Sequence, residues 1–317
     1  MAYEHDQHHD QHHGTGHENT LRRPRGEAPR HAHAHDHDHM DFGEMAGLLE
    51  QEAELFSPLY AEAAAWLREQ CPEPGLIVDA GSGPGVVSCL LADAFPASRV
   101  VAVDAVDSLL ERAYARAGRL GVADRFGTLR ADLAEGLGGM AHPAGLLWAS
   151  RSLHHVGDQG AALAGFAGAL APGGVLALLE GGLPPRYLPR DFGVGRPGLQ
   201  SRIDVVHDER FARMRAGLPG AVAETEDWPA LMAAAGLRHT ASRTFLVDLP
   251  APLSDEGRAF VVTALTRLRD TLADGLDPDD LATLGRLLDP RDEESVHHRP
   301  DVFVLTAHTV HVAVKPE

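Results

Sequence analysis

Short apolar runs alternate with segments of helical spacing through the middle of this chain. From residue 75 to residue 180, runs typical of buried strands are followed by stretches whose apolar residues recur every three or four positions. The predicted strands are 75–79, 99–104, 126–131, 145–150 and 175–180. One predicted helix ends near residue 94, and two more span 107–120 and 158–170. Strands separated by helices of this length predict a parallel sheet, with ligands bound beyond the carboxyl ends of the strands.

Further elements are predicted on both sides of this core. Before it, residues 41–74 have the apolar spacing of two helices, and Ser57 and Pro58 supply an N-cap and a first-turn proline between them. After it, residues 181–226 are rich in glycine, proline and arginine without a clear period, which predicts an irregular lid. The remaining predicted elements are a helix at 228–235, a strand at 238–249, helices near 254–271 and 278–288, and a β-rich run at 302–314.

Together these elements predict an α/β fold with a doubly wound, mostly parallel seven-stranded sheet and helices on both faces. We expect three parts, which are a disordered His-rich arm at 1–40, an N-terminal helical cap at 41–74 and a core domain at 75–317. The core domain would carry two insertions, the lid at about 181–226 and a helical insertion at about 254–288.

The first forty residues hold 11 of the 20 histidines and almost no apolar residues, so burial cannot offset the entropy of ordering them. Five of these histidines alternate with Ala and Asp, namely His31, His33, His35, His37 and His39. Imidazoles and carboxylates at this density chelate divalent transition metals. No fixed ligand spacing marks a defined zinc site, so two interpretations stay open, a metal-handling segment and a solubilising tail with incidental affinity.

Composition narrows the classes of function. There are 46 acidic and 28 basic residues, and the resulting charge of −18 repels nucleic acid, which we do not expect as a partner. No apolar run is long enough to span a membrane and the polar N-terminus is unlike a secretory signal, so we expect a cytoplasmic protein. With only Cys71 and Cys89 present, a disulfide framework is not expected.

A glycine-rich loop follows the first predicted strand and precedes a helix. It reads Asp79-Ala80-Gly81-Ser82-Gly83-Pro84-Gly85. Glycines let the backbone approach a ligand closely, and the free N–H groups at the start of a helix favour a negatively charged group. Two further acids, Asp104 and Asp132, stand at the ends of the second and third strands.

This acid-x-G-x-G-x-G arrangement resembles the first motif of the class I S-adenosylmethionine-dependent methyltransferases, and the resemblance implies S-adenosyl-L-methionine as cofactor. By that resemblance, Asp79 and the loop glycines hold the methionine end of the cofactor. Asp104 accepts hydrogen bonds from the ribose hydroxyls, and Asp132 contacts the adenine amino group. The implied cofactor-binding set is Asp79, Ala80, Gly81, Ser82, Gly83, Gly85, Asp104, Ala105, Asp132, Leu133 and Ser150. Each acid also has a simpler interpretation, as a loop cap at Asp79, a helix N-cap at Asp104 and a solvated turn residue at Asp132.

The resemblance extends over about residues 75–250. The segment Leu147–Val156, which contains Leu-His-His-Val, is similar to the fourth-strand segment of small-molecule methyltransferases, and Leu170–Gly174 is similar to their turn before the fifth strand. One departure stands at Ala144-Gly145, where family members often carry an acid.

Methyl transfer from a sulfonium needs chiefly alignment, with a base only when the nucleophile is protonated. His154 and His155 follow the fourth strand and are candidate catalytic residues, because a neutral imidazole is a plausible base. They are equally candidates for capping or packing around the cofactor.

The resemblance thus implies methyl transfer to an O, N, S or C nucleophile of a small metabolite. The predicted lid has many arginines, which indicate either an acidic substrate or pairing with acids of the core; they are Arg186, Arg190, Arg196, Arg202, Arg210, Arg213 and Arg215. Two alternatives remain, a nicotinamide-dependent oxidoreductase, since Asp104 suits a dinucleotide ribose, and a metal-handling protein that uses the His-rich arm.

Overall fold

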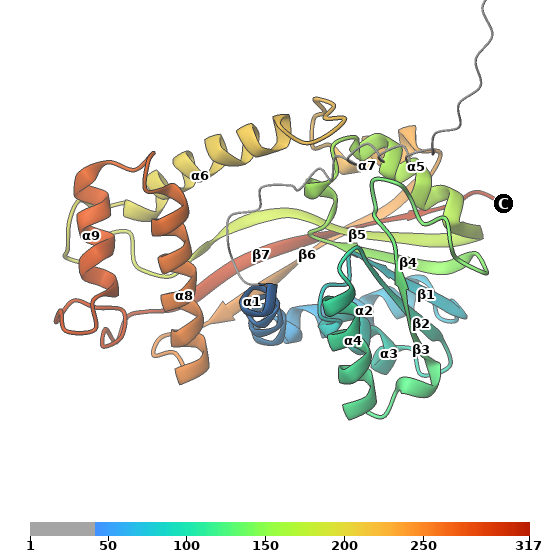
Figure 1. Ribbon diagram of the computed structural model, residues 1–317, viewed down its shortest axis with the longest axis horizontal. Helices are drawn as coiled ribbons and strands as arrows, with labels where there is room; N and C mark the ends of the chain where they lie inside the picture. The colour runs from blue at the N-terminus through green and yellow to red at the C-terminus, as the bar shows by residue number, and fades with distance from the viewer. Residues whose placement is uncertain (1–41) are drawn as a thin grey trace, which may run out of the picture. The chain divides into compact units, whose positions relative to one another are not determined.

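A seven-stranded sheet organises residues 42–317, which the computed structural model describes (Figure 1). The strands lie in the order β3-β2-β1-β4-β5-β7-β6. Strands β1 to β5 are parallel, and β7 runs antiparallel between β5 and β6. Their bounds are β1 Leu76–Ala80, β2 Arg99–Asp104, β3 Phe126–Arg130, β4 Ala144–Ser150, β5 Leu170–Arg186, β6 Arg238–Leu249 and β7 Val304–Val314. The predicted fold class is confirmed.

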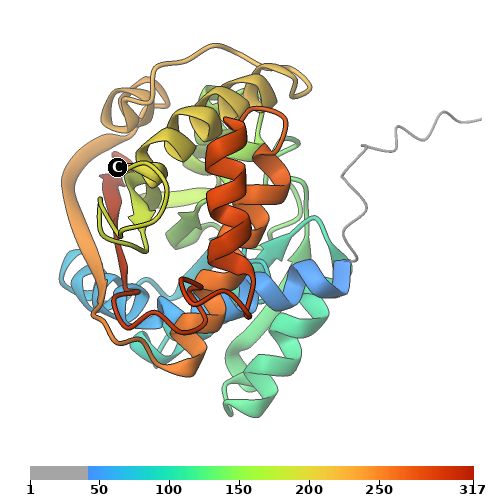
Figure 2. The same ribbon diagram turned by 90° about the vertical axis from the view of Figure 1, so that its left-hand side faces the viewer.

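Helices cover both faces of the sheet and divide its core in two (Figure 1). On one face, α2, α3 and α4 bury side chains such as Ile77 and Trp148, and on the other, α5 and α7 bury Val78 and Leu147. Helices α6, α8 and α9 form a further group beside the long strands (Figure 2). The helices are α1 Phe42–Leu55, α2 Ser57–Gln70, α3 Val86–Ala94, α4 Asp107–Arg119, α5 Gln159–Ala169, α6 Leu199–Ala216, α7 Trp228–Ala234, α8 Asp255–Leu272 and α9 Pro278–Leu288.

Residues 41–317 form one compact unit, in which α2 packs against α3 and β6. The predicted boundary at residue 74 therefore stays a prediction. The predicted His-rich arm and its metal-binding histidines lie outside the described residues. No described helix is long and apolar enough to cross a membrane, and both Cys71 and Cys89 are free thiols.

The predicted irregular structure of the lid at 181–226 is wrong for residues 181–186 and 199–216. Strand β5 continues to Arg186 because it pairs with β7, and α6 then forms an 18-residue helix. Helix α6 shows no apolar period because only Leu199 and Ile203 are buried along it. The predicted N-cap at Ser57 is also wrong, since Phe56 holds that position and Ser57 is the first helical residue.

Gly145 explains the departure from the family pattern at the start of β4. A Cβ atom at this position would lie 1.9 Å from the carbonyl oxygen of Pro74 and 2.9 Å from its Cα atom. Because these are backbone atoms, they cannot rotate away, and any side chain would push the strand from its neighbour. The segment that joins α2 to β1 therefore requires glycine here.

We predict that Gly145→Ala lowers the free energy of unfolding by about 2–3 kcal/mol, because overpacking against backbone cannot relax. Chemical denaturation monitored by circular dichroism measures the change. Gly118→Ala in α4 is the control, because nothing lies within 4 Å of its Cβ position. This change should raise the free energy of unfolding by about 0.5–1 kcal/mol. Equal stability of the two variants would contradict the prediction.

Candidate active site

The glycine loop joins β1 to α3 beside the end of β2. The N–H groups of Gly81 and Ser82 both donate to the carbonyl oxygen of Val103, at 2.8 and 2.9 Å. Gly83 has a φ of 53°, a left-handed conformation, and nothing lies within 4 Å of its Cβ position. No side chain caps the start of α3, so the first N–H groups of that helix stay free for a ligand. An open backbone of this kind fits a negatively charged group such as a carboxylate.

Two other loop glycines are required by packing. A Cβ atom at Gly81 would lie 2.5 Å from the Cβ of Ser152, and one at Gly85 would lie 2.4 Å from the Cβ of Ala113 in α4. The loop therefore touches the turn after β4 on one side and α4 on the other.

Asp104 lies at the end of β2, and its carboxylate joins the glycine loop to the start of the next segment. One carboxylate oxygen accepts the N–H of Gly83 at 2.9 Å and the other accepts the N–H of Val106 at 3.0 Å. Partial burial raises the pKa of Asp104, and the N–H groups of Val106 and Gly83 oppose that rise. Each oxygen keeps a lone pair, so the group can accept further hydrogen bonds, as a ribose diol requires.

Asp79 is buried beneath the loop and only 2% exposed. Its carboxylate accepts a hydrogen bond of 2.5 Å from the Ser88 hydroxyl in α3. Burial raises the pKa of Asp79 to about 7; the Ser88 hydrogen bond opposes this rise and the Asp104 charge adds to it. This position ties β1 to α3 and leaves almost no surface for a ligand, so direct contact with a cofactor stays a prediction.

The other predicted cofactor residues fall into an exposed and a buried group. Asp132 is exposed and accepts the N–H of Ala134 at 2.9 Å, which matches a turn role and still leaves it open to solvent. Ala105 is exposed, Ser82 is half-buried, and Ala80 and Leu133 are buried. The half-buried Ser150 is hydrogen-bonded to the hydroxyl of Tyr60 in α2.

Glu180 is a residue that sequence reasoning missed. It is 5% exposed at the end of β5's buried stretch, and one carboxylate oxygen accepts the N–H groups of Ser152 and Leu153, both at 2.9 Å. The other oxygen lies 3.4 Å from Nδ1 of His154. Its position at the end of a predicted parallel strand was the available signal, because the carboxyl ends of such strands meet at one edge.

The turn after β4 carries both candidate catalytic histidines. His154 is half-buried beside Glu180, and its ring lies 4.1 Å from that of His155 and 5.8 Å from that of Phe211 in α6. His155 is exposed. Ser152 donates its hydroxyl to the carbonyl oxygen of Ala80 at 3.2 Å, so this turn is joined directly to the glycine loop.

Arg151 is the non-glycine residue with a positive φ, 51°, among the described residues. This conformation costs about 1–3 kcal/mol and concentrates at functional sites. Its side chain is hydrogen-bonded to Glu52 and Tyr60, and three further side chains lie near enough to interact with its charge. These five residues come from several separate segments, so no spacing along the chain identifies them. We call this group the Arg151 cluster; it comprises Glu52, Tyr60, Arg151, Glu180, Tyr187 and His308.

Several arginines of the predicted lid bind groups of the protein itself. Arg186 pairs with Asp204, and Arg202 donates to both carboxylate oxygens of buried Asp280, at 2.7 and 2.8 Å. Arg215 donates to backbone carbonyls of the turn after β4, including that of His154 at 3.1 Å. Structural pairing therefore accounts for these arginines, and the acidic-substrate interpretation needs other support.

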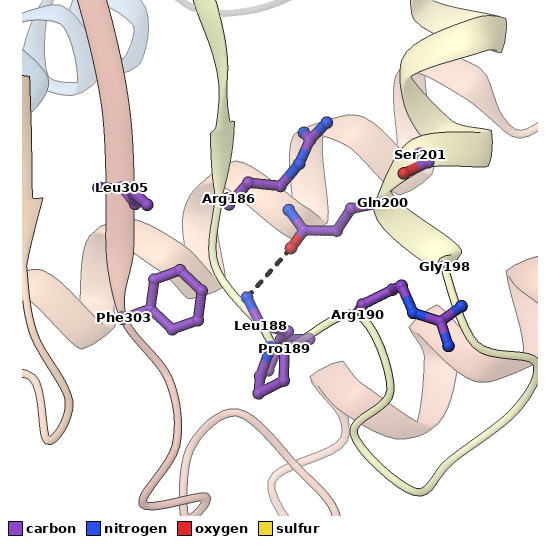
Figure 3. A pocket seen from close by; sticks show the side chains of 9 residues that line it. All are labelled: Arg186, Leu188, Pro189, Arg190, Gly198, Gln200, Ser201, Phe303 and Leu305. Carbon is purple, nitrogen blue, oxygen red and sulfur yellow. Dashed lines mark hydrogen bonds between the residues drawn. The ribbon is translucent and has the colours of Figure 1, made fainter.

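A small cavity lies between the end of β5, the start of α6 and the start of β7 (Figure 3). Within it, the Gln200 amide oxygen accepts the N–H of Leu188 at 3.0 Å. The cavity shares no residue with the glycine loop or with the turn after β4. The candidate active site lies at the carboxyl ends of β1, β2, β4 and β5, where hydrogen bonds join the glycine loop to Asp104 and to the turn after β4.

The chain is similar to known methyltransferases. A family described as "Methyltransferase domain" matches residues 77–174. A trans-aconitate 2-methyltransferase of Methylobacterium radiotolerans is 33% identical over 215 residues, which are 62% of this chain and 78% of that protein. One of Streptomyces coelicolor is 33% identical over 127 residues, 39% of this chain and 41% of that protein. The YcgJ protein of Bacillus subtilis is 16% identical, with a TM-score of 0.47 over 81% of this chain and 99% of that one.

We predict that Asp79→Asn removes a pH dependence of stability. The raised pKa means that the folded chain binds a proton more readily than the unfolded chain, so wild-type stability falls as the pH rises from about 4 to 7. The free energy of unfolding of the variant should rise relative to that of wild type across this pH range, by up to a few kcal/mol at neutral pH. Thermal melts of the ligand-free protein at several pH values measure this gain.

The matched control is Asp132→Asn, the same change at an exposed carboxylate. If the melting temperatures of Asp79→Asn and wild type run parallel between pH 4 and 7, the assigned burial of the Asp79 charge is wrong.

Proposed function

The chain belongs to the class I S-adenosylmethionine-dependent methyltransferases, and we propose that it methylates a carboxylate oxygen of a small organic acid. The observation that carries the proposal is the contact between the glycine loop and the turn after β4. Ser152 lies against Gly81 and donates to the Ala80 carbonyl oxygen at 3.2 Å. A group held at that turn would therefore face the loop that holds the cofactor.

The residues of the loop fit S-adenosylmethionine, which supplies an electrophilic methyl group on its sulfonium when bound. The open backbone at Gly83 and the uncapped start of α3 suit its carboxylate. Asp104 would accept the ribose hydroxyls, and exposed Asp132 would meet the adenine amino group. Asp79 would act indirectly, by holding the loop against α3 through Ser88.

Two observations support an organic acid as acceptor. The relatives of Methylobacterium radiotolerans and Streptomyces coelicolor are named for trans-aconitate, a carboxylic acid, and the Arg151 guanidinium lies at the β4 end of the site. A carboxylate is already deprotonated at neutral pH, so its methylation needs no base. The chain's own contribution would then be to bind the acceptor, to orient one oxygen and to exclude water.

We predict that the protein, incubated with S-adenosylmethionine and trans-aconitate, forms a monomethyl ester detectable by mass spectrometry. Asp104→Asn should weaken S-adenosylmethionine binding about 10- to 100-fold, because charge-assisted hydrogen bonds to the ribose are lost. Titration calorimetry measures this change, with Asp124→Asn, a carboxylate in the 3₁₀ turn Ala123–Arg125, as the control.

Titration with NAD⁺ in the same series tests the oxidoreductase alternative, which would gain support if NAD⁺ bound and S-adenosylmethionine did not. The metal-handling alternative rests on the His-rich arm. Within residues 46–317, no group of three or more His, Cys, Asp or Glu side chains is arranged to hold a metal ion. A chain lacking residues 1–40 should keep the methyltransferase activity, because all residues of the proposed site follow residue 41.

We predict that His154→Gln and His155→Gln each lower kcat less than about tenfold with a carboxylate acceptor, since no proton has to be removed. Steady-state kinetics at saturating S-adenosylmethionine measures the effect. A loss of about 100-fold or more in one variant would instead make that histidine a general base and point to a protonated nucleophile such as a hydroxyl.

A further inference from the structure

Helix α1 lies against the core through acidic side chains that bind two separate arginines. Glu50 and Glu54 bind Arg116 of α4, the former at 2.6 Å, and Glu52 binds Nη1 of Arg151 at 2.5 Å. The helix itself packs beside α2, α3 and α8 (Figure 1). The three glutamates thus have different tasks, because Glu52 reaches the candidate active site and the other two reach only α4.

Arg151 is shaped to present its guanidinium at that site. Its positive φ turns the chain sharply after β4, and its N–H still continues the sheet by donating to the Leu179 carbonyl oxygen at 3.0 Å. The Tyr60 hydroxyl, on α2, is hydrogen-bonded to the Arg151 side chain. The Arg151 side chain is 39% exposed, so part of it is open to solvent.

The charges around Arg151 limit which ligands can bind at its guanidinium. Two carboxylates, Glu52 and Glu180, lie near this single cation of the cluster. His308 supplies no further positive charge at neutral pH, because burial and the nearby Arg151 lower its pKa to about 4. A further anion entering beside both carboxylates would be repelled. An acidic ligand can therefore bind the Arg151 guanidinium only by displacing the carboxylate of Glu52 or of Glu180.

Glu180 cannot be the group that leaves. It is buried and accepts two backbone N–H groups of the turn after β4, which would lose their partner if it moved. Glu52 lies on α1, and its carboxylate is held in the described structure by Arg151. Guanidinium groups bind carboxylates of ligands and of side chains through the same donor geometry.

We propose that Arg151 binds a carboxylate of the acceptor and that Glu52 occupies this guanidinium as a placeholder until the acceptor displaces it. The inference rests on the proposed function and deepens it, because it assigns a residue that selects acidic acceptors and a residue that competes with them. The Glu52 carboxylate stands in for the substrate's own carboxylate. Glu52 would then contribute to specificity as a built-in competitor. An uncharged molecule could not displace it from the guanidinium.

The test measures binding of trans-aconitate to protein saturated with S-adenosylhomocysteine, where no transfer occurs. Arg151→Gln should raise the Kd at least about tenfold, since a charge-assisted hydrogen-bonding group is lost. Glu52→Gln should lower the Kd about threefold or more, because the competitor is removed. Titration calorimetry gives both values, and S-adenosylhomocysteine affinity should stay within about twofold in each variant, showing an intact fold.

Glu50→Gln is the matched control, because it weakens the contact of α1 with Arg116 and leaves Arg151 alone. It should not change the trans-aconitate Kd by more than about twofold. The trimethyl ester of the same acid, which has no charge, should bind with no dependence on Arg151.

Opposite shifts in Arg151→Gln and Glu52→Gln support the inference. It is overturned if Arg151→Gln leaves the Kd unchanged, if Glu52→Gln weakens binding, or if wild type binds no trans-aconitate while it binds S-adenosylhomocysteine. Failure of the proposed function would give a different result. Wild type would bind the acid and the two variants would show the opposite shifts in Kd, but no methyl ester would form.

Discussion

The buried carboxylate of Glu180 holds the backbone on which the candidate site depends. A carboxylate at 5% exposure has lost most of its water, and this cost is offset only by strong hydrogen bonds from the protein. The N–H groups of Ser152 and Leu153 supply them, both at 2.9 Å. The turn after β4 is thereby fixed to β5, and that turn carries Arg151 on one side and the two histidines on the other.

Close packing against two of its glycines fixes the glycine loop to this turn and to α4. Ser152 fits against Gly81 with no room for a Cβ atom, and Gly85 fits equally closely against Ala113 of α4. The loop is thus confined between a turn and a helix, while Gly83 in its middle faces open space. Rigid flanks and an open centre are what a preorganised binding loop requires.

Sequence reasoning predicted the strands and most helices because each carries its own local signal, an apolar run or an apolar period. It missed α6, whose exposed sides carry charged residues that pair across to other helices, as Arg202 does with Asp280. In the site, the glycine loop and its acids stand close together in sequence and could be identified by spacing. The Arg151 cluster could not, since Glu52, Tyr60 and His308 come from segments far apart, and only the packed sheet brings them together.

The place of β7 in the sheet has a consequence for how the protein forms. This strand follows β6 in the chain, yet it lies between β5 and β6 and pairs with both. During synthesis, β6 has no neighbour in the sheet until β7 has emerged, and β5 keeps a free edge for the same period. The last contacts to form are then long-range ones, so His308 of β7 joins the Arg151 cluster at the end of folding. Ribosome-bound chains that stop before Val304 would expose two unpaired strand edges, where association with other chains begins.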